Sequence, residues 1–386
     1  MRIDADVQLE RFRAGVQAFL AEHQPGAKHH TGVRAPDREL VPAIRAFTAK
    51  LFDAGYFGAD WPLAYGGRAD YDPAEAFIVA EEIARAGTWA PIGAATNLGA
   101  AALIEFGTPE QQAEYLPRIR SAEHLWCQLF SEPGAGSDLA GLQTKARLDG
   151  DHWVVDGQKV WTTNGHHADI GYLLARTDPS AAKHAGITAF ILDMTSPGIE
   201  VRPLREITGT SDFNEVFLDG VRIPADRVIG RVNDGWRVAN SSLAHERSGV
   251  AASSAELIRH LDDLRGLASD DAATRQRVGA IATRVLVSDA MSKAVQSHML
   301  AATDDAADAA LVKIYFSETN LALAELGMDL QGVGGIVTEG DEDAVAEGWW
   351  QDAYLYARAY TIAGGATEVL KNVVAERALK MPREPR

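Results

Sequence analysis

The sequence predicts an α+β fold in which a β-rich part lies between two helical parts. Two observations predict it. Residues 1–122 and 231–386 carry apolar side chains at helical spacing, whereas residues 123–230 form short β-type runs separated by turn residues. We therefore expect three domains with these boundaries: an N-terminal helical domain, a middle β domain and a C-terminal helical domain.

The composition is that of a folded globular protein. The 386 residues are 46% hydrophobic and 24% charged, and the formal net charge is −17. This charge argues against nucleic-acid binding, which requires clustered Lys and Arg. Cys127 is the only cysteine, so no internal disulfide is expected, and it lies in an apolar run that suggests a packed core thiol. We expect a cytoplasmic protein without a signal peptide or a membrane span.

The first 122 residues predict several helices. Apolar residues recur at helical spacing over residues 7–20, and residues 74–86 form a second amphipathic run. Thr108 is a candidate N-cap, Pro109 suits the first helical position, and Gln111 can complete a capping box. A helix is therefore expected to begin at Pro109.

The middle part predicts a meander of strands. Asp149-Gly150, Asp156-Gly157 and Asn164-Gly165 favour tight hairpin turns, because these residues tolerate positive φ. Further turns are expected at residues 196–198 and at Asp219-Gly220. The other expected strands lie at residues 172–175, 187–192, 199–204 and 216–218.

Helical periodicity returns from Gly235 onward. Ala-rich runs predict long helices over residues 271–302 and 305–327. Residues 349–380 predict two more helices, broken at Gly364-Gly365. The C-terminal part is therefore expected to be a helical bundle that mediates oligomerisation.

Two motifs in the middle part are long and specific. Residues 131–138 have the sequence Ser-Glu-Pro-Gly-Ala-Gly-Ser-Asp, and residues 157–165 have the sequence Gly-Gln-Lys-Val-Trp-Thr-Thr-Asn-Gly. Together they closely resemble the two flavin-contacting segments of the acyl-CoA dehydrogenases. The resemblance continues through residues 61–67, 81–85, 106–117 and 362–377, and so extends over nearly the whole chain.

The resemblance implies a fold, a cofactor and a reaction. The implied fold has an N-terminal helical domain, a middle β-barrel domain and a C-terminal four-helix bundle, assembled as dimers of dimers. The implied cofactor is FAD, with an acyl-CoA thioester stacked on the flavin. A base removes the α-proton of the thioester while hydride passes from its β-carbon to flavin N5. The family also implies an electron-transfer flavoprotein as oxidant.

The position of the base is unusual for the family. Many members carry a catalytic Glu where this chain has Gly364, and a minority carry it on an earlier helix, where Glu246 stands here. We expect Glu246 to be the base, because a Glu is absent at the first position and present at the second. Burial raises the pKa of such a Glu from about 4.3 towards working pH. Glu368 is the second candidate. The alternative role of Glu246 is that of an ion-paired residue beside Arg247.

The resemblance also assigns binding residues. The backbone N–H of Gly364 is expected to donate to the thioester oxygen. Arg247 and Ser137 are expected to contact CoA, although Arg247 could equally be a helix-surface charge. The expected cofactor contacts are Gln128, Phe130, Ser131, Gly136, Ser137, Trp161, Thr163 and Glu368. The alternative for Trp161 is ordinary core packing.

Two departures from the family concern the neighbouring subunit's FAD. The usual Arg-x-Phe-Gly segment, whose Arg reaches that cofactor, is missing near residues 257–266, and Arg259 and Arg265 are candidate substitutes. The Gly-Gly-x-Gly loop is altered at residues 331–335. Both departures suggest the base-carrying subunit of a heterotetramer acting on a bulky or steroid side-chain acyl-CoA. A homo-oligomer is the alternative.

Two other functions are compatible with the same fold. One is a non-catalytic partner subunit, against which Glu246 argues. The other is a flavin monooxygenase or oxidase, against which Glu246 and Arg247 together argue. Ala363, Gly364 and Ala366 leave room for a bulky acyl group without identifying it.

Overall fold

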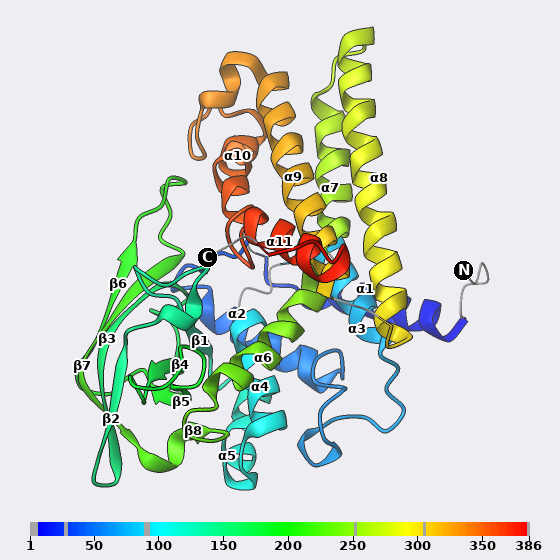
Figure 1. Cartoon of the computed structure of the whole chain (residues 1–386). Helices are drawn as coiled ribbons and strands as arrows, with labels where there is room; N and C mark the ends of the chain where they lie inside the picture. The colour runs from blue at the N-terminus through cyan, green and yellow to red at the C-terminus, as the bar shows by residue number, and fades with distance from the viewer. Residues whose placement is uncertain (1–6, 27–29, 89–92, 251–252, 304–305, 384–386) are drawn as a thin grey trace. The chain divides into compact units, whose positions relative to one another are not determined.

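A computed structural model describes residues 7–26, 30–88, 93–250, 253–303 and 306–383, with the backbone alone for residues 93–95, 244–250 and 306. The chain forms two compact units (Figure 1). The β unit comprises residues 33–71 and 90–246. The helical unit comprises residues 1–32, 72–89 and 247–386. No helix within the described ranges is long and apolar enough to span a membrane.

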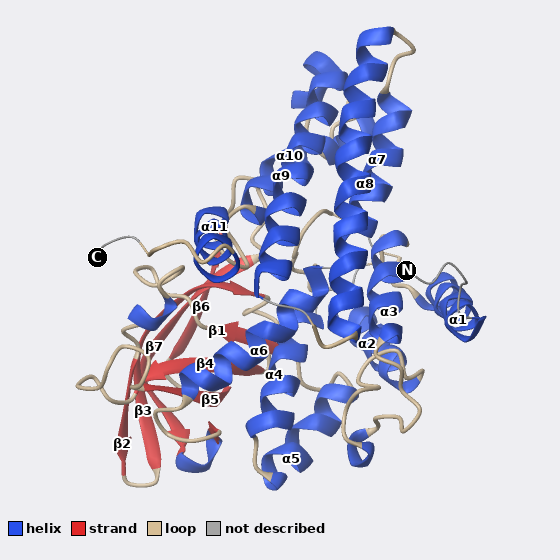
Figure 2. Cartoon of the chain, turned by 45° about the vertical axis from the view of Figure 1, so that its right-hand side comes forward, coloured by secondary structure: helices blue, strands red, loops and turns tan. Residues whose placement is uncertain are grey.

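The β unit is built on one eight-stranded sheet, drawn in red in Figure 2. The strand order is β6-β7-β3-β2-β4-β5-β8, and β1 pairs with β4 in parallel. β4 and β5 are buried along almost their whole length, as their apolar sequences require. The strands are β1 (Trp126–Leu129), β2 (Lys145–Asp149), β3 (His152–Thr163), β4 (Ile170–Arg176), β5 (Ile187–Asp193), β6 (Ile199–Leu204), β7 (Phe213–Pro224) and β8 (Val228–Ile229).

Four α-helices begin in the described part of the β unit: α2 (Val41–Asp53), α4 (Gly93–Phe106), α5 (Pro109–Arg120) and α6 (Gly235–Val250). The predicted capping box of α5 is confirmed. Gln111 donates its backbone N–H to the Thr108 hydroxyl, and the Gln111 side chain accepts from the Thr108 N–H. Aromatic and aliphatic side chains of α4, α5, β1 and β4 fill one continuous core, which therefore fixes these elements against one another.

The helical unit contains α1 (Val7–His23), α3 (Ala74–Arg85), α7 (Ser253–Leu267), α8 (Ala272–Leu300), α9 (Ala306–Gln331), α10 (Trp349–Tyr360) and α11 (Thr367–Val373). α7, α8, α9 and α10 lie side by side in both views (Figures 1 and 2). Trp350 is fully buried at their centre and lies over Gly327, where a Cβ would approach the indole to 2.0 Å. Glycine is therefore required at this position of α9.

The predicted elements largely agree with the structure, but two turn predictions are wrong. Asp149-Gly150 forms the predicted hairpin turn, whereas Asp156-Gly157 lies inside β3 and Asp219-Gly220 inside β7. The β3–β7 register shifts between Val155 and Gly157, and the Gly220 N–H donates to the Asp156 carboxylate at 2.8 Å. The two Asp-Gly pairs therefore form a bulge between paired strands rather than two turns.

The third predicted hairpin is also corrected. Asn164 has a left-handed φ of 57° and ends β3, so a turn does form there. The next strand, β4, pairs with β1, β2 and β5 rather than with β3. The Asn164-Gly165 turn therefore leads out of one strand pair into another part of the sheet.

Candidate active site

The structure brings the two predicted flavin segments side by side in the β unit. The Val160 N–H, in the middle of one segment, donates to the Ser131 carbonyl of the other at 2.9 Å. This bond lies outside the regular strand ladders. It therefore joins the Gly-rich loop after β1 directly to the end of β3.

A buried ion pair reinforces this junction. The Lys159 ammonium lies 2.8 Å from a Glu132 oxygen and donates to the Phe130 carbonyl at 3.0 Å. Lys159 is fully buried and Glu132 is nearly so. Burial lowers the pKa of Lys159 to about 8 despite the nearby carboxylate, whereas Lys159 and backbone donors lower the pKa of Glu132 although burial opposes this.

The Gly-rich loop presents backbone rather than side chains. Glu132 and Ala135 exchange backbone hydrogen bonds of 3.1 and 3.0 Å, which close a tight turn. No atom lies within 4 Å of a Cβ built on Gly134 or Gly136, and Ser137 is exposed. The loop is therefore an open backbone surface of the kind that accommodates a cofactor pyrophosphate.

Trp161 is displayed on the surface of the same junction. Its side chain is 60% exposed, which excludes core packing, and its edge contacts the Phe213 ring at 6.0 Å between centroids. Its φ of 60° is strained for a bulky residue. Thr162 points the other way, is fully buried, and has its carbonyl fixed by the Asn214 amide at 2.9 Å. The exposed indole is therefore available to a planar ligand.

The remaining predicted cofactor residues of this unit lie nearby. Gln128 on β1 is half-buried, as are Ser131 and Thr163. Phe130 is buried and packs edge-to-face on Tyr172 at 4.9 Å. These residues come from β1, β3 and the loop between β1 and β2, which the sheet holds together.

The predicted base lies on α6, one helical turn after Ser242. The Ser242 hydroxyl lies 3.1 Å from the Tyr172 hydroxyl, so α6 is tied to β4 in the core beneath Phe130. The side chains of Glu246 and Arg247 lie outside the described residues.

Gly364 and Glu368 lie in the helical unit, Gly364 in the loop between α10 and α11 and Glu368 in α11 itself. Gly364 and Gly365 have φ of 64° and 99°, which glycine adopts without strain. Space around Gly364 is open, and its N–H has no hydrogen-bond partner among the described residues. Glu368 lies exposed in the first turn of α11.

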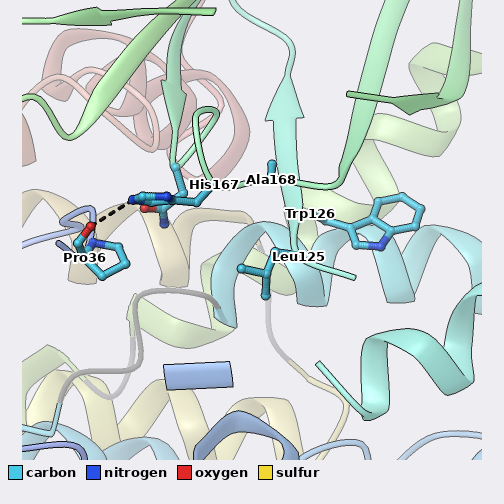
Figure 3. A pocket seen from close by; sticks show the side chains of 6 residues that line it. Pro36, Leu125, Trp126, His167 and Ala168 are labelled. Atoms are coloured by element: carbon cyan, nitrogen blue, oxygen red, sulfur yellow. Dashed lines mark hydrogen bonds between the residues drawn. The ribbon is translucent and has the colours of Figure 1, made fainter. Parts of the chain in front are cut away.

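A small cavity lies beside the second flavin segment (Figure 3). His167 reaches the Pro36 carbonyl across 2.9 Å at its edge. Its volume of about 10 Å³ is roughly that of one buried water. The cavity is therefore too small for an acyl-CoA. The residues that line it are Pro36, Leu125, Trp126, Asn164, His167 and Ala168.

Cys127 is confirmed as a core thiol. It is fully buried on β1, and burial raises its pKa to about 12. We expect iodoacetamide at pH 8 to label the native protein more than roughly 100-fold more slowly than the denatured chain, because the thiolate is the nucleophile. Mass spectrometry measures both rates. Equal rates would contradict a buried Cys127.

The sequence analysis missed Lys159 and Glu132. A lysine within a strand is usually solvent-facing, so no role was predicted for Lys159. Glu132 was predicted only as part of the Gly-rich segment. Strand alternation gave no usable signal, because the exposed Trp161 and the buried Lys159 are two residues apart but separated by an irregularity in the ladder. Regular alternation would have placed both on one face.

The chain belongs to the acyl-CoA dehydrogenase family. Its sequence matches the family's N-terminal domain over residues 7–123, its middle domain over 127–221 and its C-terminal domain over 233–379. It is therefore an acyl-CoA dehydrogenase, an oxidoreductase, and members of this family use FAD.

Three similar proteins illustrate the relationship. Acyl-CoA dehydrogenase IpdE1 of Mycobacterium tuberculosis is 38% identical over 97% of this chain and 98% of its own. Acyl-CoA dehydrogenase FadE34 of the same organism is 43% identical over 93% of this chain, which spans only 51% of that relative. The solved structure of the Tcur3481-Tcur3483 steroid ACAD superposes with a TM-score of 0.90 at 29% identity, covering 100% of each chain.

Proposed function

We propose that this protein catalyses FAD-dependent α,β-dehydrogenation of an acyl-CoA thioester with Glu246 as the base. The observation that carries the proposal is the junction of the two flavin segments, where an exposed Trp161 lies beside an open Gly-rich loop. FAD, when bound, supplies the hydride acceptor. Gln128, Phe130, Ser131, Gly136, Ser137, Trp161, Thr163 and Glu368 are the residues proposed to hold it.

The chain's own groups account for the remaining chemistry. Glu246 takes the α-proton, and the Gly364 N–H donates to the thioester oxygen, where negative charge develops. That N–H is available, since it has no partner among the described residues. Ser137 and Arg247 are proposed to bind CoA. The open space at Gly364 gives room for a bulky acyl group.

We further propose that this chain is the base-carrying subunit of a paired enzyme. Arg265 donates to Asp262 at 2.8 Å on its own helix, and Arg259 lies beside Asp263 and the half-buried Glu256, so carboxylates already engage both candidate substitutes. Two comparisons support the pairing. FadE34 is about twice as long as this chain. The name of a similar solved structure, the Tcur3481-Tcur3483 steroid ACAD, joins two proteins and names a steroid substrate class.

The remaining proposals follow from the family. We propose domain boundaries after residues 122 and 230, with the base and the oligomer contacts in the last domain. An electron-transfer flavoprotein is the proposed oxidant. The lone, buried Cys127 supports a cytoplasmic location.

The test is the FAD content per chain together with the oligomer mass, followed by bleaching of the flavin absorbance on adding acyl-CoA. We expect little FAD in the chain alone and about half an FAD per chain when a related subunit co-purifies. One FAD per chain in an active homo-oligomer would contradict the pairing alone. Oxygen consumption by the reduced flavin, with no bleaching of the flavin absorbance on adding acyl-CoA, would contradict the dehydrogenase.

A further inference from the structure

Lys313 is a nearly buried cation that the proposed reaction does not yet use. It lies on α9 within an apolar stretch of sequence, and only 7% of its surface is exposed. Its ammonium donates to the Gly365 carbonyl at 2.6 Å. Burying a charged lysine is costly, so its charge-assisted hydrogen bond to one backbone carbonyl indicates that the position of that carbonyl matters.

The bonded carbonyl belongs to the loop that carries the proposed oxyanion donor. Gly364 and Gly365 are consecutive glycines, both with left-handed φ, so this stretch of backbone has unusual rotational freedom. A hydrogen-bond donor stabilises developing charge only when its direction is fixed beforehand. The Gly364 N–H therefore requires an anchor on each side.

The structure supplies both anchors. On the N-terminal side, the Ala363 N–H donates to the Ala359 carbonyl at 2.8 Å and so continues α10 up to the glycines. On the C-terminal side, Lys313 holds the Gly365 carbonyl. The Thr367 N–H closes the loop on the Thr361 carbonyl at 3.0 Å. Between these anchors only the two glycines remain free to rotate.

We propose that Lys313 is a positioning residue that fixes the Gly364-Gly365 loop so that the Gly364 N–H points at the thioester oxygen of the acyl-CoA. This inference rests on the proposed function of Gly364. Burial lowers the pKa of Lys313 to about 8, although the Glu368 carboxylate opposes the shift.

The experiment compares Lys313→Met with the unchanged full chain, each in the oligomer that it forms on expression. Lys313→Arg keeps the charge and a donor. Lys371→Met is the matched control, because Lys371 is an exposed α11 lysine paired with Glu318 of α9 at 3.4 Å. Circular dichroism first establishes that all four proteins are folded.

The first readout is hydrogen exchange of a fragment covering residues 361–367, measured without substrate. Lys313→Met is expected to accelerate exchange at Ala363 and Thr367 by about tenfold, because their hydrogen bonds close the anchored loop. Lys371→Met is expected to leave it unchanged. This readout does not depend on FAD or on turnover.

The second readout is the acid dissociation constant with which bound acetoacetyl-CoA loses a proton to form its enolate. The ultraviolet absorbance of the enolate measures it. Binding to the unchanged protein is expected to raise this constant, and Lys313→Met to lower it again by about tenfold, with partial recovery in Lys313→Arg. If Lys313→Met matches the unchanged protein in either readout, the positioning role is overturned.

A different result separates the inference from the proposed function. If the unchanged protein leaves the acid dissociation constant of acetoacetyl-CoA at its solution value, Gly364 does not polarise the thioester and the proposed function of this loop fails. Faster exchange in Lys313→Met would then establish loop anchoring by itself and overturn the catalytic part of the inference.

Discussion

Glu246→Gln is expected to lower kcat by on the order of 10³-fold, because the variant keeps the shape of the side chain but removes the proposed base for the α-proton. FAD content and the thermal midpoint are expected to remain within error of the unchanged protein. Turnover is measured with an artificial electron acceptor under saturating acyl-CoA, so that the loss is assigned to the chemical step rather than to binding.

The matched control is Glu110→Gln, which removes an exposed carboxylate at the start of α5, far along the chain from the proposed base. It is expected to leave kcat unchanged. Full activity of Glu246→Gln would refute the assignment of the base and favour a non-catalytic partner subunit. Loss of activity in Glu368→Gln alone would move the assignment to the second candidate.

Lys159→Met is expected to lower the free energy of unfolding by about 3 kcal/mol, because it leaves the Glu132 carboxylate buried without its cation. The loss is moderated by the Gln143 and Thr144 N–H groups, which still donate to that carboxylate. It remains a large fraction of the roughly 5–15 kcal/mol that stabilises a typical domain. Urea unfolding of the apoprotein measures the change.

The double variant Glu132→Gln with Lys159→Met is expected to regain part of this loss. Removing both charges leaves no uncompensated ion, so a double-mutant cycle should give a coupling energy of about 1–3 kcal/mol. Lys145→Met is the matched control, since Lys145 is exposed on β2. A Lys159→Met effect no larger than that of Lys145→Met would show that the buried pair does not stabilise the junction.

The fold could largely be predicted from local patterns. The capping box at Thr108 and Gln111 placed the start of α5 correctly, because it depends only on residues three apart. The Asp-Gly pairs at 156 and 219 were wrongly predicted to form turns, because a glycine with positive φ is found in a bulge as well as in a turn. Only the pairing of β3 with β7 distinguishes the two.

Motifs in the sequence predict which residues form the candidate site, but not which residues support them. Motif similarity identified Trp161 and the Gly-rich loop, and the structure adds that the indole is exposed and the loop open. Lys159 and Lys313 carry no local signal, since each is partnered by a residue far away in the chain. Burial of a cation becomes visible only when the chain is folded.

The sequence by itself determined the family, the alternation of helical and β parts, and the presence of a glycine at 364 and a glutamate at 246, on which the proposed position of the base depends. These depend on residue identity and short spacing. The tertiary structure alone decided which backbone groups are held and which are free. Lys159 joins the two flavin segments and Lys313 anchors the glycine loop, because a buried charge must find its partner across space rather than along the chain.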